Sequence, residues 1–296
     1  MHSQTKFYHG LVVFAVIIIC MIFLAAPAQY YFGIYGLALT ELMLMAIAFI
    51  SAIILKLDFK NVFSLKLPPI HYFFAALFIY SGMYILILLV LSTTEYFFPS
   101  INEVSEAIIS IGTNTTPGVS LVIMAVLPAV CEELLHRGLI LYSFKHIKKT
   151  AVITICMGVI FGLFHLDPYR FLSTALLGGT FAYFTLKTDS IFLPMLFHFI
   201  TNTVSVFAMF SVDNTDLQTN TAVVSHTGMT LASLWLVLGS IALPSIYTGI
   251  MVFNHKSMKS HKTAAVIIIS VIILIIGLVL SYISLSDTDH LKIVLG

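Results

Sequence analysis

Apolar residues dominate the chain in nine runs that short polar stretches separate. Most of these runs reach the roughly 20 residues that an α-helix needs to cross a bilayer. Residues 150–166 and 171–186 form shorter runs, which is typical of tilted or broken helices that line a cavity. The pattern therefore predicts an all-α, polytopic transmembrane bundle of eight to nine membrane segments. The runs are 8–26, 35–55, 70–91, 118–143, 150–166, 171–186, 190–210, 229–253 and 264–284.

Composition supports this interpretation. The 296 residues are 59% hydrophobic and only 9% charged, whereas a soluble domain has about 25% charged residues. We therefore expect an integral, multi-pass membrane protein whose surface contacts membrane lipid. The net charge of +1 argues against a nucleic-acid partner, because such proteins carry basic patches that neutralise phosphates.

Basic residues indicate the orientation, because short cytoplasmic loops retain Lys and Arg. With the N-terminus in the cytoplasm, only Arg170 and Lys292 fall outside, and the outer loops 92–117 and 211–228 contain neither Lys nor Arg. We therefore predict a cytoplasmic N-terminus and solvated outer connections. The cytoplasmic lysines would be Lys6, Lys56, Lys60, Lys66, Lys145, Lys148, Lys149, Lys187, Lys256, Lys259 and Lys262.

The first 28 residues have two interpretations. Lys6, an apolar stretch and "AAPAQ" resemble a signal peptide that is cleaved after Ala28. The apolar run is long for a signal peptide, so we expect an uncleaved anchor.

Several ionisable residues lie inside these apolar runs, where a charged side chain costs several kcal/mol and indicates a function. Glu41 stands alone near the end of the second run, and we expect an interfacial or hydrogen-bonded side chain there. The other intramembrane polar residues are Glu132, Glu133, His136, Arg137, His165, His198 and Asn202.

Helical spacing separates the two adjacent glutamates. Glu133 and Arg137 are four residues apart and can form a buried ion pair, whereas Glu132 points about 100° away. The pair then has a structural role, and Glu132 has no such partner. His136 shares a face with Glu132, either as its hydrogen-bond partner or as a packed ring, and we expect packing.

Distances along the helices predict that these groups meet at one depth. At about 1.5 Å per residue from the nearest cytoplasmic lysine, Glu132, His165, His198 and Asn202 lie at roughly 20, 24, 17 and 22 Å. Three helices would thus bring a carboxyl, two imidazoles and a carboxamide into one layer of the hydrocarbon core.

This set suits hydrolysis of an acyl bond by activated water. A carboxylate and an imidazole can bind a water molecule and remove its proton, and a second His with an Asn can stabilise an oxyanion. Zinc bound by Glu132, His165 and His198 is the competing interpretation, although the chain has no HExxH motif. We favour direct activation with no cofactor.

Three motifs carry a family resemblance. "EELLHR" (Glu132, Glu133, Arg137), "FGLFH" (Phe161, His165) and "HFITN" (His198, Asn202) resemble the EExxxR, FxxxH and HxxxN motifs of CPBP/ABI intramembrane proteases, a family that includes the CAAX proteases and bacteriocin-processing proteins. The resemblance covers residues 118–207. It divides the chain into N-terminal segments (1–117), a catalytic core (118–207) and C-terminal segments (208–296).

The resemblance implies a role for each motif residue. Glu132 and His165 would activate water, and His198 and Asn202 would form the oxyanion hole. Glu133, Arg137 and Phe161 would support the site. The substrate would be a membrane-associated or lipidated peptide or protein, and the location a bacterial plasma membrane.

Two interpretations from other classes remain open. Intramembrane Glu and His residues also relay ions or protons in transporters, although the inverted repeat or paired broken helices typical of transporters are not evident. A non-catalytic immunity or scaffold protein would retain the same fold and bind a partner. Such a protein would tolerate loss of Glu132, whereas a protease would not.

Overall fold

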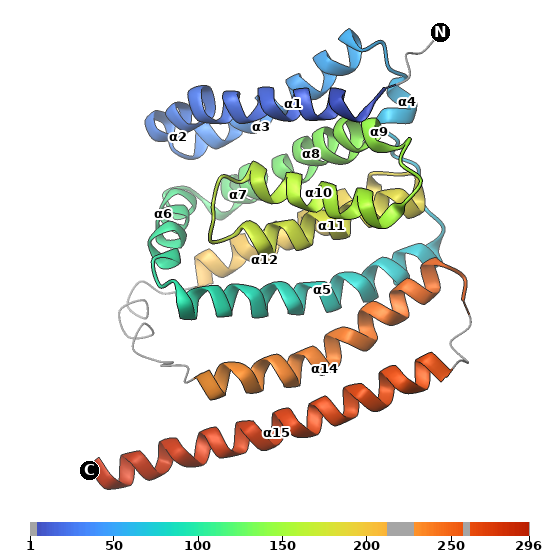
Figure 1. Cartoon of the computed structure of the whole chain (residues 1–296). Coiled ribbons are helices and arrows are strands. Elements are labelled where there is room, and N and C mark those ends of the chain that lie inside the picture. The colour runs from blue at the N-terminus through green and yellow to red at the C-terminus, as the bar shows by residue number, and fades with distance from the viewer. Residues whose placement is uncertain (1–4, 212–227, 257–260, 296) are drawn as a thin grey trace. The chain divides into compact units, whose positions relative to one another are not determined.

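The computed structural model describes residues 5–211, 228–256 and 261–295, and these are helices joined by short turns (Figure 1). Every predicted apolar run contains helix, and no strand occurs in the described ranges, so the all-α prediction is confirmed. The helices of the first half are α1 (Phe7–Cys20), η1 (Met21–Ala25), α2 (Ala26–Phe32), α3 (Ile34–Ile54), α4 (Phe59–Val62), α5 (Ile70–Phe97), α6 (Ile101–Thr113), α7 (Pro117–Leu121), η2 (Val122–Val126), α8 (Leu127–Glu133), η3 (Leu134–Ile140) and α9 (Leu141–Phe144). The others are α10 (Thr150–Phe164), α11 (Phe171–Thr188), α12 (Phe192–Ser211), α14 (Gly228–Phe253) and α15 (His261–Leu295).

Seven helical stretches among the described residues are long and apolar enough to cross a membrane. The helix α10 is shorter, with 15 residues, and α11 is not among the seven. Together α10 and α11 form a hairpin, so the chain returns to its starting side whether both helices cross or neither does. The predicted orientation of the later spans is therefore unaffected. The seven are Phe7–Phe32, Ile34–Ile54, Ile70–Phe97, Pro117–Phe144, Phe192–Ser211, Thr230–Phe253 and His261–Ile283.

The chain divides into two compact units. Unit 1 comprises Met1–Pro69 and Asn102–Asp213, and unit 2 comprises Ile70–Ile101 and Asn214–Gly296. In unit 1, α3 and α12 both pack against α8, and α1 packs against α9. Its core is mostly aliphatic and includes fully buried Leu44, Leu135 and Met157.

Small residues bring α10 and α11 close together (Figure 1). An added Cβ at Gly158 would lie 2.6 Å from the Ala175 carbonyl oxygen, and one at Gly178 would lie 2.5 Å from Phe161 Cβ. Close backbone approach through glycine is typical of helix pairs in membranes. This packing fixes the position of Phe161, which begins the FxxxH motif.

Connections that the lysine pattern assigns to the cytoplasm meet at one end of unit 1. Asp189 follows α11 and binds Lys145 at 2.6 Å and Lys66 at 3.8 Å. The Ile191 amide also donates to the Ser64 carbonyl at 2.8 Å. The sequence therefore correctly groups these loops on one side of the bundle.

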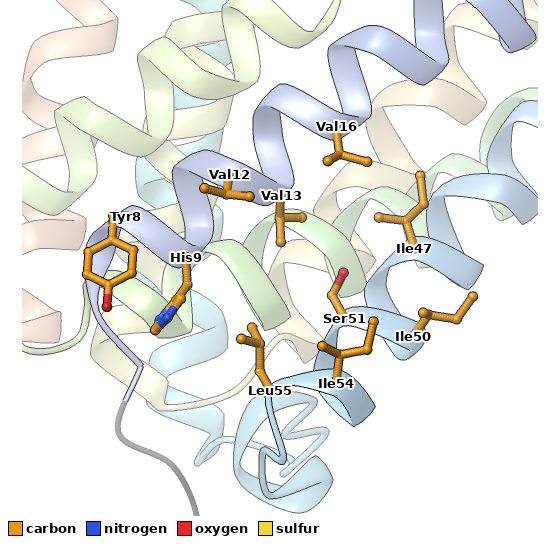
Figure 2. A pocket seen from close by; sticks show the side chains of 10 residues that line it. All are labelled: Tyr8, His9, Val12, Val13, Val16, Ile47, Ile50, Ser51, Ile54 and Leu55. Atoms are coloured by element: carbon orange, nitrogen blue, oxygen red, sulfur yellow. The ribbon is translucent and has the colours of Figure 1, made fainter.

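A groove of about 420 Å³ lies between α1 and α3 in unit 1 (Figure 2). Aliphatic side chains form most of its wall, including Val12, Val16 and Ile50. Tyr8 and His9 lie near one end of the groove, as Figure 2 shows. Its lining contains no carboxylate, so it is chemically unlike the site described below.

In unit 2, α14 packs against both α5 and α15. An added Cβ at Gly249 would lie 2.5 Å from the Ala75 carbonyl oxygen, so α5 and α14 are in close contact. Trp235 also donates from its indole nitrogen to Thr93 Oγ1 at 2.7 Å.

The connection at 92–117 differs from the predicted solvated loop. The helix α5 continues to Phe97, and α6 occupies Ile101–Thr113. The apolar residues Val104, Ile108 and Ile111 recur at helical spacing among polar ones, so α6 presents an apolar face. The predicted outer connection at 211–228 lies almost entirely outside the described residues, as does the side chain of Lys292.

Candidate active site

The EExxxR motif lies in the span Pro117–Phe144, in which every residue of 131–141 is buried. Glu132 and Glu133 end α8, and the π-helical segments η2 and η3 lie on either side of α8. Such π-helical turns are frequent at functional sites. Both glutamates are buried, with relative exposures of 7% for Glu132 and 0% for Glu133.

Glu133 is held from two directions. Arg137 Nη1 donates to Glu133 Oε1 at 2.8 Å, which is the ion pair that the spacing predicts. His198 Nδ1 donates to the same oxygen at 2.8 Å from α12. The negative charge of Glu133 is therefore compensated by a fully buried guanidinium and oriented by a second helix.

Arg137 binds three elements at once. Its Nη2 donates to the Gly178 carbonyl at 3.0 Å, which ties it to α11. Its guanidinium carbon lies 4.3 Å from the centroid of the Phe161 ring on α10. Because cation–π contacts are strongest where water is absent, Phe161 stabilises the buried cation. This contact gives Phe161 a physical role in the motif.

Glu132 differs from its neighbour because its Oε2 atom is buried without a hydrogen-bond partner. His198 Nε2 lies 3.9 Å from this oxygen, which is too far for a hydrogen bond. The carboxyl group of Glu132 is thus available to a water molecule or a substrate.

His165 has a defined tautomer. Its Nδ1 donates to the Phe161 carbonyl at 2.8 Å, because a carbonyl oxygen only accepts. In the neutral ring, Nε2 then carries the lone pair and can accept a proton.

Glu132 and His165 line one cavity of about 300 Å³ in unit 1. The cavity lies at the end of the bundle away from Asp189, where α2 meets α3 and α10 meets α11. Its walls come from η1, α2, α3, α6, η2, α8, the end of α10 and the α10–α11 turn. The lining residues are Met21, Gln29, Leu37, Thr40, Glu41, Ile108, Ile111, Ile123, Met124, Pro128, Glu132, Phe164, His165, Asp167 and Arg170.

The other motif residues lie near this cavity but are not part of its lining. His198 donates from Nδ1 to Glu133, and its Nε2 lies 3.9 Å from Glu132 Oε2. Asn202 is half-buried and follows His198 by one turn of α12. The structure thus brings together Glu132, His165 and His198, whereas Asn202 is placed only by its position one turn after His198 on α12.

His136 is a packed ring, as expected. Its Nδ1 donates to the backbone carbonyl of Glu132 at 3.0 Å, and its ring lies edge-on to Phe161 and Phe164. It makes no hydrogen bond to the Glu132 carboxyl group.

Metal binding needs ligands that converge on one point. Among the described residues, no group of three or more His, Cys, Asp or Glu side chains is arranged to hold a metal ion. His198 directs Nδ1 to Glu133 instead. The prediction of direct activation by Glu132 and His165 stays a prediction.

Sequence reasoning missed the position of Glu41. This residue was expected at an interface or in a hydrogen bond, yet it is 8% exposed, its Oε2 has no partner, and it lines the same cavity as Glu132. The sequence does show that no basic residue lies within one helical turn of Glu41, so the residue has no local ion-pair partner. The bond between His198 and Glu133 has no local signal, because 65 residues separate them.

Comparisons with known proteins agree with the motifs. Residues 114–204 match the Rce1-like family, described as type II CAAX prenyl endopeptidase Rce1-like. This segment contains every residue of the three motifs. No curated protein and no solved structure matches the chain.

Proposed function

Because residues 114–204 match the Rce1-like family, described as type II CAAX prenyl endopeptidase Rce1-like, we propose that the protein is an intramembrane endopeptidase that cleaves a membrane-associated or lipidated peptide. Its catalysis depends on glutamate and needs no metal. One observation carries the proposal: Glu132 presents an unpartnered carboxyl oxygen in a cavity that His165 also lines.

In the proposed reaction, a water molecule binds between the Glu132 carboxylate and His165 Nε2. Glu132 removes a proton as the water oxygen attacks the carbonyl carbon of the scissile peptide bond. The resulting tetrahedral intermediate collapses, the carbon–nitrogen bond breaks, and Glu132 returns the proton to the leaving amine. This sequence is general acid–base catalysis by one carboxyl group.

His198 and Asn202 stabilise the oxyanion in this proposal. His198 Nδ1 already donates to Glu133, so Nε2 donates to the oxyanion when the ring carries both protons. The hydrogen bond to Glu133 Oε1 holds that ring in place. Preorganised donors of this kind contribute a large part of the rate enhancement in acyl transfer.

The lysine pattern also suggests the direction of access. The cavity lies at the end of unit 1 away from the Asp189 ion pairs with Lys66 and Lys145. If those loops are cytoplasmic, a substrate enters from the outer face. We propose the plasma membrane of a bacterium as the location.

The test compares membrane proteomes of cells that carry the wild-type protein or Glu132→Gln. A precursor should accumulate in the variant, and purified wild-type protein in lipid vesicles should cleave that precursor. Glu106→Gln on α6 is the matched control, because Glu106 is exposed and does not line the cavity.

The same comparison also distinguishes a protease from a non-catalytic scaffold or immunity protein. A scaffold or immunity protein would keep its biological activity in Glu132→Gln and show no accumulated precursor. That result would refute the proposed activity.

A further inference from the structure

We propose that Glu41 forms a substrate subsite, in which its carboxylate binds a basic side chain of the peptide. This inference rests on the proposed endopeptidase function. It assigns a specificity role to α3, which lies outside the family match at 114–204.

The first observation is an unsatisfied carboxyl group. Glu41 is 8% exposed, and its Oε2 atom has no hydrogen-bond partner. A buried carboxylate without a partner costs several kcal/mol. A donor group on the bound substrate that pairs with Glu41 would remove this cost.

The second observation is the charge of the cavity lining. Arg170 is the cation among the lining residues, and its Nε donates to Asp167 Oδ2 at 2.6 Å. Asp167 thus compensates Arg170, while Glu41 and Glu132 remain as two further acids. Arg137 does not line the cavity and is bound to Glu133. The cavity therefore holds two carboxyl groups for which its lining supplies no cationic partner.

The third observation is a fixed wall beside Glu41. Gln29 on α2 donates to Thr40 Oγ1 at 2.9 Å, and Thr40 donates to the Gly36 carbonyl at 2.9 Å. The first bond joins α2 to α3 immediately next to Glu41, and the second, within α3, orients the Thr40 side chain. The carboxyl group is consequently presented from a rigid surface.

A Lys or Arg side chain fits this chemistry. Its charged end would satisfy Glu41, and its aliphatic stem would contact the apolar lining residues Leu37, Ile108 and Ile123. The volume of about 300 Å³ is at the lower end for ligand cavities. It suits one extended side chain with the adjoining peptide.

The first experiment uses the wild-type protein alone. The peptide cleaved in the proteomic test is synthesised with Lys or with norleucine at each position around the scissile bond. At one position, Lys should raise kcat/KM by about 10- to 100-fold over norleucine, the range of a charge-assisted hydrogen bond. Equal rates at every position would overturn the inference.

The second experiment assigns the preference to Glu41. Glu41→Gln should lower kcat/KM for the Lys peptide by about the same factor, mainly through KM, and leave the norleucine peptide almost unchanged. Glu41→Asp keeps the charge and should retain part of the preference. Glu106→Gln should behave as wild type. A Lys preference that survives in Glu41→Gln would refute the assignment.

The two proposals fail in different ways. If wild type and Glu132→Gln both leave every peptide intact, the proposed function is wrong. If wild type cleaves and Glu132→Gln does not, but Lys gives no advantage, only the role of Glu41 is wrong.

Discussion

Glu132 and Glu133 are adjacent in the chain, but replacing each with Gln should affect the stability of the protein very differently. Glu133→Gln leaves the Arg137 guanidinium without its counterion, and Arg137 is only 1% exposed. Removing one partner of a buried pair costs about 3–5 kcal/mol. Glu132 has no ion-pair partner within hydrogen-bond distance, so Glu132→Gln should change stability by less than about 1 kcal/mol and remove cleavage.

The assay is reversible unfolding in mixed micelles, followed by the fluorescence of Trp235 or by circular dichroism. A domain has about 5–15 kcal/mol of total stability, so Glu133→Gln should lower the folded yield sharply. Adding Arg137→Met to Glu133→Gln removes the unpaired charge. The double variant should recover part of the loss, because replacing both members of a buried pair with uncharged groups costs less than removing one.

Two results would refute this reasoning. Equal unfolding free energies for Glu132→Gln and Glu133→Gln would show that the ion pair contributes no stability. Strictly additive losses in the Glu133→Gln and Arg137→Met double variant would show that the two residues do not interact.

Three further predictions concern packing, the oxyanion and metals. Gly178→Ala should lower stability by about 1–3 kcal/mol in the same unfolding assay, because the new Cβ meets Phe161, whereas Gly118→Ala, with open space around it, should not. His198→Gln and Asn202→Ala should each lower kcat by about 10²- to 10³-fold with little change in KM; unchanged kcat would exclude the oxyanion role. Cleavage should persist after exhaustive chelation, and activity that zinc alone restores would favour the metal mechanism.

Much of the fold could be predicted from the sequence because lipid imposes strong constraints. Backbone polar groups need internal partners within a bilayer, so long apolar runs such as 34–54 become helices, as the structure shows. The prediction failed for α6, because the stretch 92–117 between two apolar runs was interpreted as a solvated connection. The apolar spacing of Val104, Ile108 and Ile111 was the stronger signal.

The site could be predicted only where its contacts are local. The pair of Glu133 and Arg137 lies within one helical turn, so spacing alone identifies it. The Arg137 bond to the Gly178 carbonyl joins residues 41 positions apart, and nothing in either segment indicates it. Glu41 and Glu132 line one cavity from different helices for the same reason. Long-range packing decides these contacts, and a single sequence does not encode them in any local pattern.

These long-range contacts link the stability of the bundle to the proposed chemistry. Arg137 and His198 bind the same oxygen of Glu133, so Glu133 holds together α8 and α12 while it directs His198 Nε2 toward Glu132. A change at Glu133 should therefore disturb both folding and the oxyanion hole. Kinetic effects of such variants must be measured at a known folded fraction. A fall in kcat that remains after this correction reports the orientation of His198.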